Sequence, residues 1–279
     1  MPVTKHRRKY LPYITLFFLF LLSVNIYATP QNPKTVIAGD SRAVGMAQTS
    51  GFTRIASLPN ITNYGNGQGG VYYNSSKDCI ILGIVGAGYT WLWDTSSNRL
   101  NASFKSAIRT YCGKSSECFI LMGANDYYLT ESSMGAKKIA SYYIKTARRI
   151  RTATKCRFVT LLGTFNASGA LNYLYSVYRY NACLAKLKYY QAKKVRKLNR
   201  KYYGYADTNV VASSLAYADS LHLTGSSSAK LLAYILSLAD EREKAQTENS
   251  DTTAIAAEVT SGDISAQNEA LPVVIQTDF

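Results

Sequence analysis

Three apolar runs, each ending in a polar turn that contains glycine, are the feature that most constrains the fold of this 279-residue chain. The runs begin at Thr35, Cys79 and Phe119 and lead into the turns 39–41, 86–88 and 123–126. Segments of helical character lie between and after them. Strands alternating with helices predict an α/β domain with a mostly parallel sheet covered on both faces. The turns then share one edge of the sheet, where open α/β sheets bind ligands.

We therefore expect a three-layer α/β/α sandwich with five strands. The expected strands are 35–38, 79–85, 119–122, 158–162 and 203–206. The expected helices, besides one that starts at Ser41, are 98–111, 134–150, 181–201 and 224–242. The glycine-rich stretch 63–70 is predicted to be a mobile loop. It is not a phosphate-binding loop, because no Gly-Lys-Ser/Thr opens a helix after it.

The N-terminus has the pattern of a targeting segment. Four basic residues lie between Lys5 and Lys9, an apolar run covers 14–24, and Ala28 offers a cleavage site. Residues 1–28 are predicted to be a signal peptide or, since the run extended to 11–28 approaches the length of a membrane span, an N-terminal anchor. Either alternative places the domain outside the cytoplasm: it is extracellular, or it is anchored to the membrane and faces outside.

The distribution of charged residues separates a basic part of the chain from an acidic C-terminal part. The net charge is +15, yet residues 241–279 carry eight acidic and only two basic residues. Large apolar residues are also rare beyond Gln246 until Leu271. We expect one folded domain over residues 33–244 and an acidic, disordered tail over residues 245–279.

The five cysteines fit no zinc-binding pattern, and no histidine lies near them. Cys112 and Cys118 flank a short turn, so an exported domain would allow them to pair. The alternative is that all five are buried thiols that act as small hydrophobic side chains. Neither alternative provides a metal site.

Ser41 is the first candidate for chemistry. The motif Gly39-Asp40-Ser41 follows an apolar strand and opens a helix, with Gly39 expected to permit the turn through its backbone freedom. A hydroxyl at this position lies beside unpaired backbone N–H groups, which stabilise negative charge.

His222 is the second candidate. The chain has two histidines, and His6 lies in the targeting segment, so His222 is the only histidine of the exported domain. Asp219 precedes it by three residues and is placed to turn back onto Nδ1. Such a bond fixes the tautomer and aims Nε2 at a nucleophile.

These motifs resemble the SGNH (GDSL-type) hydrolase family over residues 34–244. The family's nucleophile turn corresponds to Gly39-Asp40-Ser41, its Gly-x-Asn-Asp block to residues 123–126, and its Asp-x-x-His block to Asp219 and His222. The family's oxyanion glycine corresponds best to Gly88, with Gly86 an alternative.

The resemblance implies a flavodoxin-like fold and a role for each residue. Ser41, His222 and Asp219 would form the catalytic triad, and no cofactor or metal would be needed. The oxyanion hole would consist of the backbone N–H groups of Ser41 and Gly88 and the side chain of Asn125. Arg42, which replaces a frequent leucine, and Asp126 are expected to bind substrate.

Substrate preference has a second source in the charge pattern. From Lys137 to Lys201 there are seventeen Lys or Arg residues and no acid. These residues form either a solvated face or a surface that holds anionic cell-envelope polymer or lipid headgroups. Because the domain is expected to be exported, nucleic acid is not expected as a partner.

The sequence thus predicts an exported serine esterase that removes acetyl or other short acyl groups from carbohydrate or a related ester. A cell-envelope sugar O-acyltransferase with the same triad and a lipase or lysophospholipase-type esterase are alternatives. A non-enzymatic wall-binding module is the least favoured one. The oligomeric state is not predicted.

Overall fold

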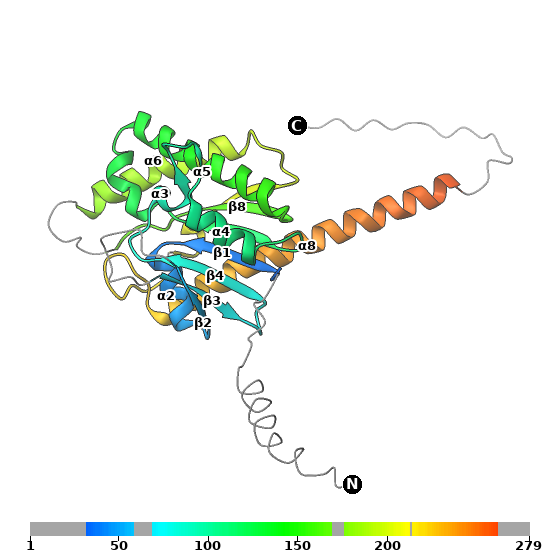
Figure 1. Ribbon diagram of the computed structural model, residues 1–279, viewed down its shortest axis with the longest axis horizontal. Coiled ribbons are helices and arrows are strands. Elements are labelled where there is room, and N and C mark those ends of the chain that lie inside the picture. Colours follow the sequence, from blue (N-terminus) through cyan, green and yellow to red (C-terminus); the bar gives the residue numbers. More distant parts are fainter. Residues whose placement is uncertain (1–31, 59–68, 169–175, 213, 262–279) are drawn as a thin grey trace, which may run out of the picture. The chain divides into compact units, whose positions relative to one another are not determined.

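The computed structural model describes residues 32–58, 69–168, 176–212 and 214–261 (Figure 1). The predicted leader 1–28 lies outside these residues, as do most of the glycine-rich stretch and the last eighteen residues. The chain comprises two units, Met1–Tyr234 and Ile235–Phe279, of which the first contains the sheet and all candidate site residues. No helix in the described ranges has the length and apolarity of a membrane span.

A seven-stranded sheet organises the first unit, in the order β2-β3-β4-β1-β7-β8-β9. β4, β1, β7, β8 and β9 run parallel, and β3 and β2 continue the sheet as antiparallel strands. The strands are β1 (Thr35–Gly39), β2 (Thr53–Ser57), β3 (Gly69–Asn74), β4 (Cys79–Ile84), β7 (Glu117–Leu121), β8 (Phe158–Gly163) and β9 (Tyr203–Asp207). A separate hairpin pairs β5 (Trp93–Asp94) with β6 (Arg99–Leu100).

The prediction of a mostly parallel α/β sheet is confirmed, and its five strands correspond to the five parallel strands. The strand count was wrong, because β2 and β3 were missed. β2 is largely exposed and shows no apolar alternation. β3 begins with Gly69 and Gly70, which were assigned to the mobile loop. A Cβ on Gly70 would lie 2.7 Å from Arg54 Nε, so glycine here allows β2 and β3 to pack closely.

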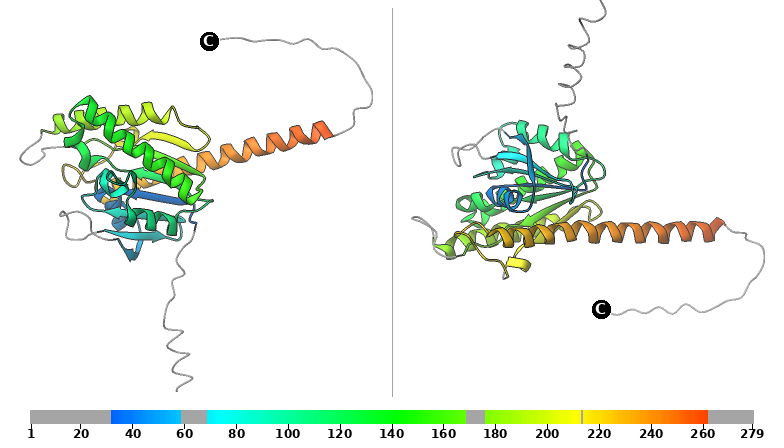
Figure 2. Two further views of the ribbon diagram at one scale, coloured as in Figure 1. Left: turned by 45° about the horizontal axis from the view of Figure 1, so that its top comes forward. Right: turned by 90° about the horizontal axis from the view of Figure 1, so that it is seen from below.

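Helices cover both faces of the sheet (Figures 1 and 2). Val36, Ala38 and Leu82 of the central strands pack in one core with helices α3 to α6. On the other face α2 packs against β4, where a Cβ on Gly83 would lie 2.7 Å from Val44 Cγ2. The helices are α2 (Ser41–Thr49), α3 (Tyr89–Leu92), α4 (Ala102–Tyr111), α5 (Ser133–Thr154), α6 (Val177–Val195), α7 (Asn209–Ala212) and α8 (Gly225–Ser261), with a 3₁₀ segment η1 (Ala124–Thr130).

Local capping explains the helix boundaries. The expected helix 98–111 begins only at Ala102, because Asn101 accepts the N–H of Ser103 and residues before it form β6. α5 begins after Ser132, whose hydroxyl accepts the N–H of Gly135, and ends at Lys155 in the left-handed conformation. Its buried residues recur at helical spacing, so a single face packs on the sheet.

One further expectation needs correction. α8 continues through Ser261, so residues 245–261 are helical rather than disordered; they contain neither proline nor glycine, and Gly262 follows. Of the two alternatives for the cysteines, the structure has the buried thiols, since all five cysteines are free and buried. The Cys112 thiol lies 3.8 Å from Thr154 Oγ1.

Candidate active site

The turn from β1 into α2 presents Ser41 as the first residue of the helix. Asp40 caps the helix, because its Oδ1 accepts the N–H of Arg42 at 3.0 Å. Burial raises the pKa of Asp40, with the Arg42 charge opposing this effect. Gly39 is required for space rather than for its backbone angles: a Cβ there would lie 2.4 Å from Ala43 Cβ, and its φ is not among the positive ones.

Ser41, His222 and Asp219 form one hydrogen-bonded line. Ser41 Oγ lies 2.8 Å from His222 Nε2, and His222 Nδ1 lies 2.7 Å from Asp219 Oδ2. The structure therefore brings together three residues separated by up to 181 positions in the sequence. The arrangement is that of a hydroxyl beside a base whose second nitrogen is held by a carboxylate.

The loop that carries His222 is closed by its own hydrogen bonds. Asp219 Oδ1 accepts the N–H groups of Leu221 and His222, each at 2.7 Å. A bridge between Tyr217 and Leu223 closes the loop behind them. Although partial burial opposes it, these bonds hold the pKa of Asp219 below its ordinary value. The carboxylate is thus ionised at neutral pH and accepts the imidazole N–H.

Asn125 and Gly88 line the same pocket as Ser41 and His222. Asn125 Nδ2 donates to the backbone oxygen of Ala87 at 2.9 Å, which orients the amide. An amide has two N–H donors, so the second is available for a ligand. Gly86, the alternative oxyanion residue, also lines the pocket, and its φ of 75° accounts for glycine at that position.

Asp126, which was expected to bind substrate, lines the pocket of Ser41, but its carboxylate is bonded within the protein. Its carboxylate is buried and accepts the N–H of Tyr89 at 3.0 and 3.2 Å and the O–H of Tyr143 at 2.5 Å. Burial raises its pKa to about 6, against the lowering effect of the Tyr143 bond. A Cβ on Gly88 would lie 2.3 Å from Asp126 Oδ1. Asp126 therefore holds the Gly88–Tyr89 backbone in position.

Arg42, the other residue expected to bind substrate, also lines the pocket, and its guanidinium is likewise bonded within the protein. Its side chain is buried and donates from Nη1 to Thr164 Oγ1 and Phe165 O, each at 3.1 Å. Nη2 donates to Tyr180 Oη at 3.3 Å, and the guanidinium lies 4.2 Å from the centre of the Phe165 ring. Arg42 thereby ties the start of α2 to the segment after β8 and to α6.

The pocket has a volume of about 610 Å³. Besides Ser41, His222, Asn125 and the glycines, its lining includes residues that the sequence analysis missed, namely Val85, Tyr89, Thr90, Tyr127, Tyr128 and Leu221. Tyr127 and Tyr128 directly follow the Gly-x-Asn-Asp block, which was the available signal. No group of side chains suited to a metal ion occurs in the part of the chain that the structure describes.

Comparisons with known proteins add structural neighbours only. No family model matches the chain, and no curated protein matches it either. An aryl esterase of M. smegmatis shares 13% identity, with 75% of this chain and 99% of that chain covered and a TM-score of 0.45. The C-terminal catalytic domain of a Streptococcus pneumoniae peptidoglycan O-acetyltransferase shares 14% identity, with 76% of this chain and 96% of that chain covered and a TM-score of 0.44. A carbohydrate acetylesterase of Sinorhizobium meliloti shares 14% identity, with 76% of this chain and 99% of that chain covered and a TM-score of 0.41.

Identities this low and TM-scores below 0.5 leave the assignment to rest on the chain's own residues. Ser41 stands after a parallel strand, and Asn125 and the Asp219–His222 pair converge on it in one pocket. These residues take up the arrangement that was expected from the resemblance of the sequence motifs to SGNH hydrolases.

Proposed function

We propose that this protein is an exported serine esterase that removes acetyl or other short acyl groups from carbohydrate or a related ester. The observation that carries the proposal is the line from Ser41 Oγ through both nitrogens of His222 to Asp219, with steps of 2.8 and 2.7 Å. Export is supported by the leader pattern of residues 1–28.

In the first half of the reaction, Ser41 Oγ attacks the ester carbonyl while its proton passes to His222 Nε2. Asp219 stabilises the imidazolium that forms. The oxyanion accepts hydrogen bonds from the N–H groups of Ser41 and Gly88 and from the free amide N–H of Asn125. Breakdown of the tetrahedral intermediate breaks the ester C–O bond, and the alcohol leaves with the proton from His222.

In the second half, water attacks the acyl-Ser41 carbonyl and gives its proton to His222. Collapse of this intermediate releases the carboxylic acid, and the proton returns to Ser41. A sugar hydroxyl in place of water would give an acyltransferase by the same steps. None of these proposed reaction steps uses a metal or a cofactor.

The pocket lining supports a polar alcohol and a short acyl group. Tyr89, Thr90 and Tyr128, whose side chains carry hydroxyl groups, line the pocket together with Asn125. Tyr128 is 57% exposed, and tyrosine combines a flat apolar ring with a wet hydroxyl. A long acyl chain would instead require an extended apolar lining.

The test is a series of p-nitrophenyl esters of increasing chain length, followed by an acetylated polysaccharide with the released and transferred acetyl groups both quantified. We expect the shortest esters to be cleaved fastest, free acetate to appear from the polymer, and Ser41→Ala to be inactive. Preference for long chains would support the lipase alternative, and transfer of acetyl to an added oligosaccharide would support the acyltransferase. No ester cleavage by the wild type would refute the proposal.

A further inference from the structure

The helices on one face of the sheet carry charge of a single sign. α4, α5 and α6 contain no Asp or Glu, while α4 contributes two Lys or Arg residues, α5 six and α6 five. Solvated surfaces ordinarily mix both signs, because like charges repel and destabilise the fold. Partial burial is the main cause that lowers the pKa of Lys194, and the charges of Lys137 and Lys197 lower it further. A bound polyanion would relieve the repulsion.

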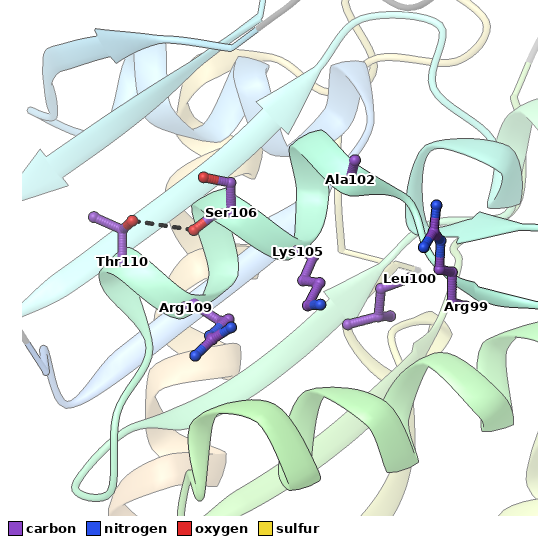
Figure 3. A pocket seen from close by; sticks show the side chains of 7 residues that line it. All are labelled: Arg99, Leu100, Ala102, Lys105, Ser106, Arg109 and Thr110. Carbon is purple, nitrogen blue, oxygen red and sulfur yellow. Dashed lines mark hydrogen bonds between the residues drawn. The ribbon is translucent and has the colours of Figure 1, made fainter. Parts of the chain in front are cut away.

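The first of two basic hollows lies along α4 and has a volume of about 500 Å³ (Figure 3). Its cations are Arg99, Lys105 and Arg109, all exposed. Lys105 and Arg109 are one helical turn apart and project from the same side of α4 in Figure 3. Among the described residues, none of the three is in an ion pair with a carboxylate. Their charge is therefore free for a ligand.

The second hollow has a volume of about 320 Å³ and is lined by Asn98, which directly precedes Arg99 of the first hollow in the sequence. Its cations are Lys145, Arg148 and Arg149 of α5. Lys145 Nζ donates to Asn98 Oδ1 at 2.9 Å, which ties α5 to the β5–β6 turn. The two hollows together place six cations on adjoining surface.

Aromatic rings connect this basic surface to the catalytic pocket. Tyr89 lines the pocket of Ser41, and its ring stacks on Tyr142 at a centroid distance of 5.0 Å and an interplanar angle of 8°. Lys145 Nζ lies 5.6 Å from the centroids of both Tyr142 and Trp93. A series of contacts therefore leads from the Ser41 pocket through the stacked Tyr89–Tyr142 pair to Lys145 in the second hollow.

We propose that these two hollows bind the acidic groups of an anionic polysaccharide whose acylated sugar occupies the Ser41 pocket. The substrate class rests on the proposed esterase function, while the binding surface can be tested without it. The chemistry shared by its ligands is a carboxylate or phosphate on a sugar chain, which Arg recognises through paired N–H donors. Concave hollows and an aromatic approach fit a chain of rings better than a flat membrane.

The test measures binding of the full chain carrying Ser41→Ala, so that no ester is cleaved. The probes are polygalacturonate, a glycerol phosphate polymer, neutral dextran and phosphatidylglycerol vesicles, each at low and high salt. One variant removes three cations of the hollows, Lys105→Gln/Arg109→Gln/Arg149→Gln. A control removes three exposed lysines outside α4, α5 and α6, Lys77→Gln/Lys114→Gln/Lys230→Gln.

We expect salt-sensitive binding to at least one anionic polymer and none to dextran. The hollow variant should bind roughly tenfold or more weakly, since each lost cation removes one screened contact, while the control stays near the parent. The two acidic polymers distinguish carboxylate from phosphate. Equal losses in both variants, no polymer binding, or stronger binding to the vesicles would overturn the proposal. With Ser41 restored, unchanged p-nitrophenyl acetate turnover in the hollow variant separates this outcome from failure of the esterase assignment.

Discussion

Asp126→Asn tests whether the buried carboxylate under Gly88 is held at an energetic cost. Burial raises its pKa from 3.8 to about 6. At about 1.4 kcal/mol for each pKa unit, ionising Asp126 in the folded protein costs about 3 kcal/mol relative to the unfolded chain. Because the folded state holds the proton more tightly, this group contributes most stability below pH 4. The contribution is lost as the pH rises toward 6.

Asparagine is neutral at every pH, and its Oδ1 can still accept the N–H of Tyr89. The free energy of unfolding of the wild type, relative to that of Asp126→Asn, should therefore fall by about 2 kcal/mol between pH 4 and 7. Urea denaturation of both proteins across this range measures the difference. Asp78→Asn, at an exposed carboxylate, controls for the loss of one charge. Parallel pH dependences of the wild type and Asp126→Asn would refute the reasoning.

Four further changes have defined outcomes. Gly88→Ala should reduce kcat strongly, because the added Cβ would lie 2.3 Å from a carboxylate oxygen of Asp126. Gly45→Ala should leave kcat unchanged, because the added Cβ would meet nothing within 4 Å. Since alanine favours the helix over glycine, Gly45→Ala should also raise the free energy of unfolding by about 1 kcal/mol in urea denaturation. Asn125→Ala should lower kcat for p-nitrophenyl acetate by about 10²–10³ with little change in KM, and an unchanged kcat would remove it from the oxyanion hole. Asp219→Asn should abolish most of kcat/KM at every pH, because a neutral amide cannot stabilise the imidazolium; retention of most activity would reduce the triad to a Ser41–His222 pair.

Four of the parallel strands, β1, β4, β7 and β8, could be predicted because each is buried on both faces and contains an apolar run. The fifth, β9, is only partly buried and had the weaker signal of a short run rich in tyrosine. β2 could not be predicted, since an exposed edge strand has no such run. The start of α4 was predicted too early for a similar reason. Asn101 is recognised as its N-cap only once the preceding β6 residues are seen to pair with β5.

The polar residues of the site divide in the same way. Ser41, Asp219 and His222 could be brought together from motif order and the scarcity of histidine. Arg42 and Asp126 adjoin these motifs and looked equally suited to a ligand. Only the fold reveals that both side chains are buried against internal partners.

The central claim is that Ser41 is a nucleophile activated by His222. The most direct measurement is reaction of the intact protein with a fluorophosphonate, which phosphonylates an activated serine and releases fluoride, followed by mass spectrometry of the peptides. A single adduct on the peptide containing Ser41, absent from Ser41→Ala and greatly slowed in His222→Ala, is the predicted result. An adduct on another residue, or an Ser41→Ala variant that still cleaves esters, would contradict the account.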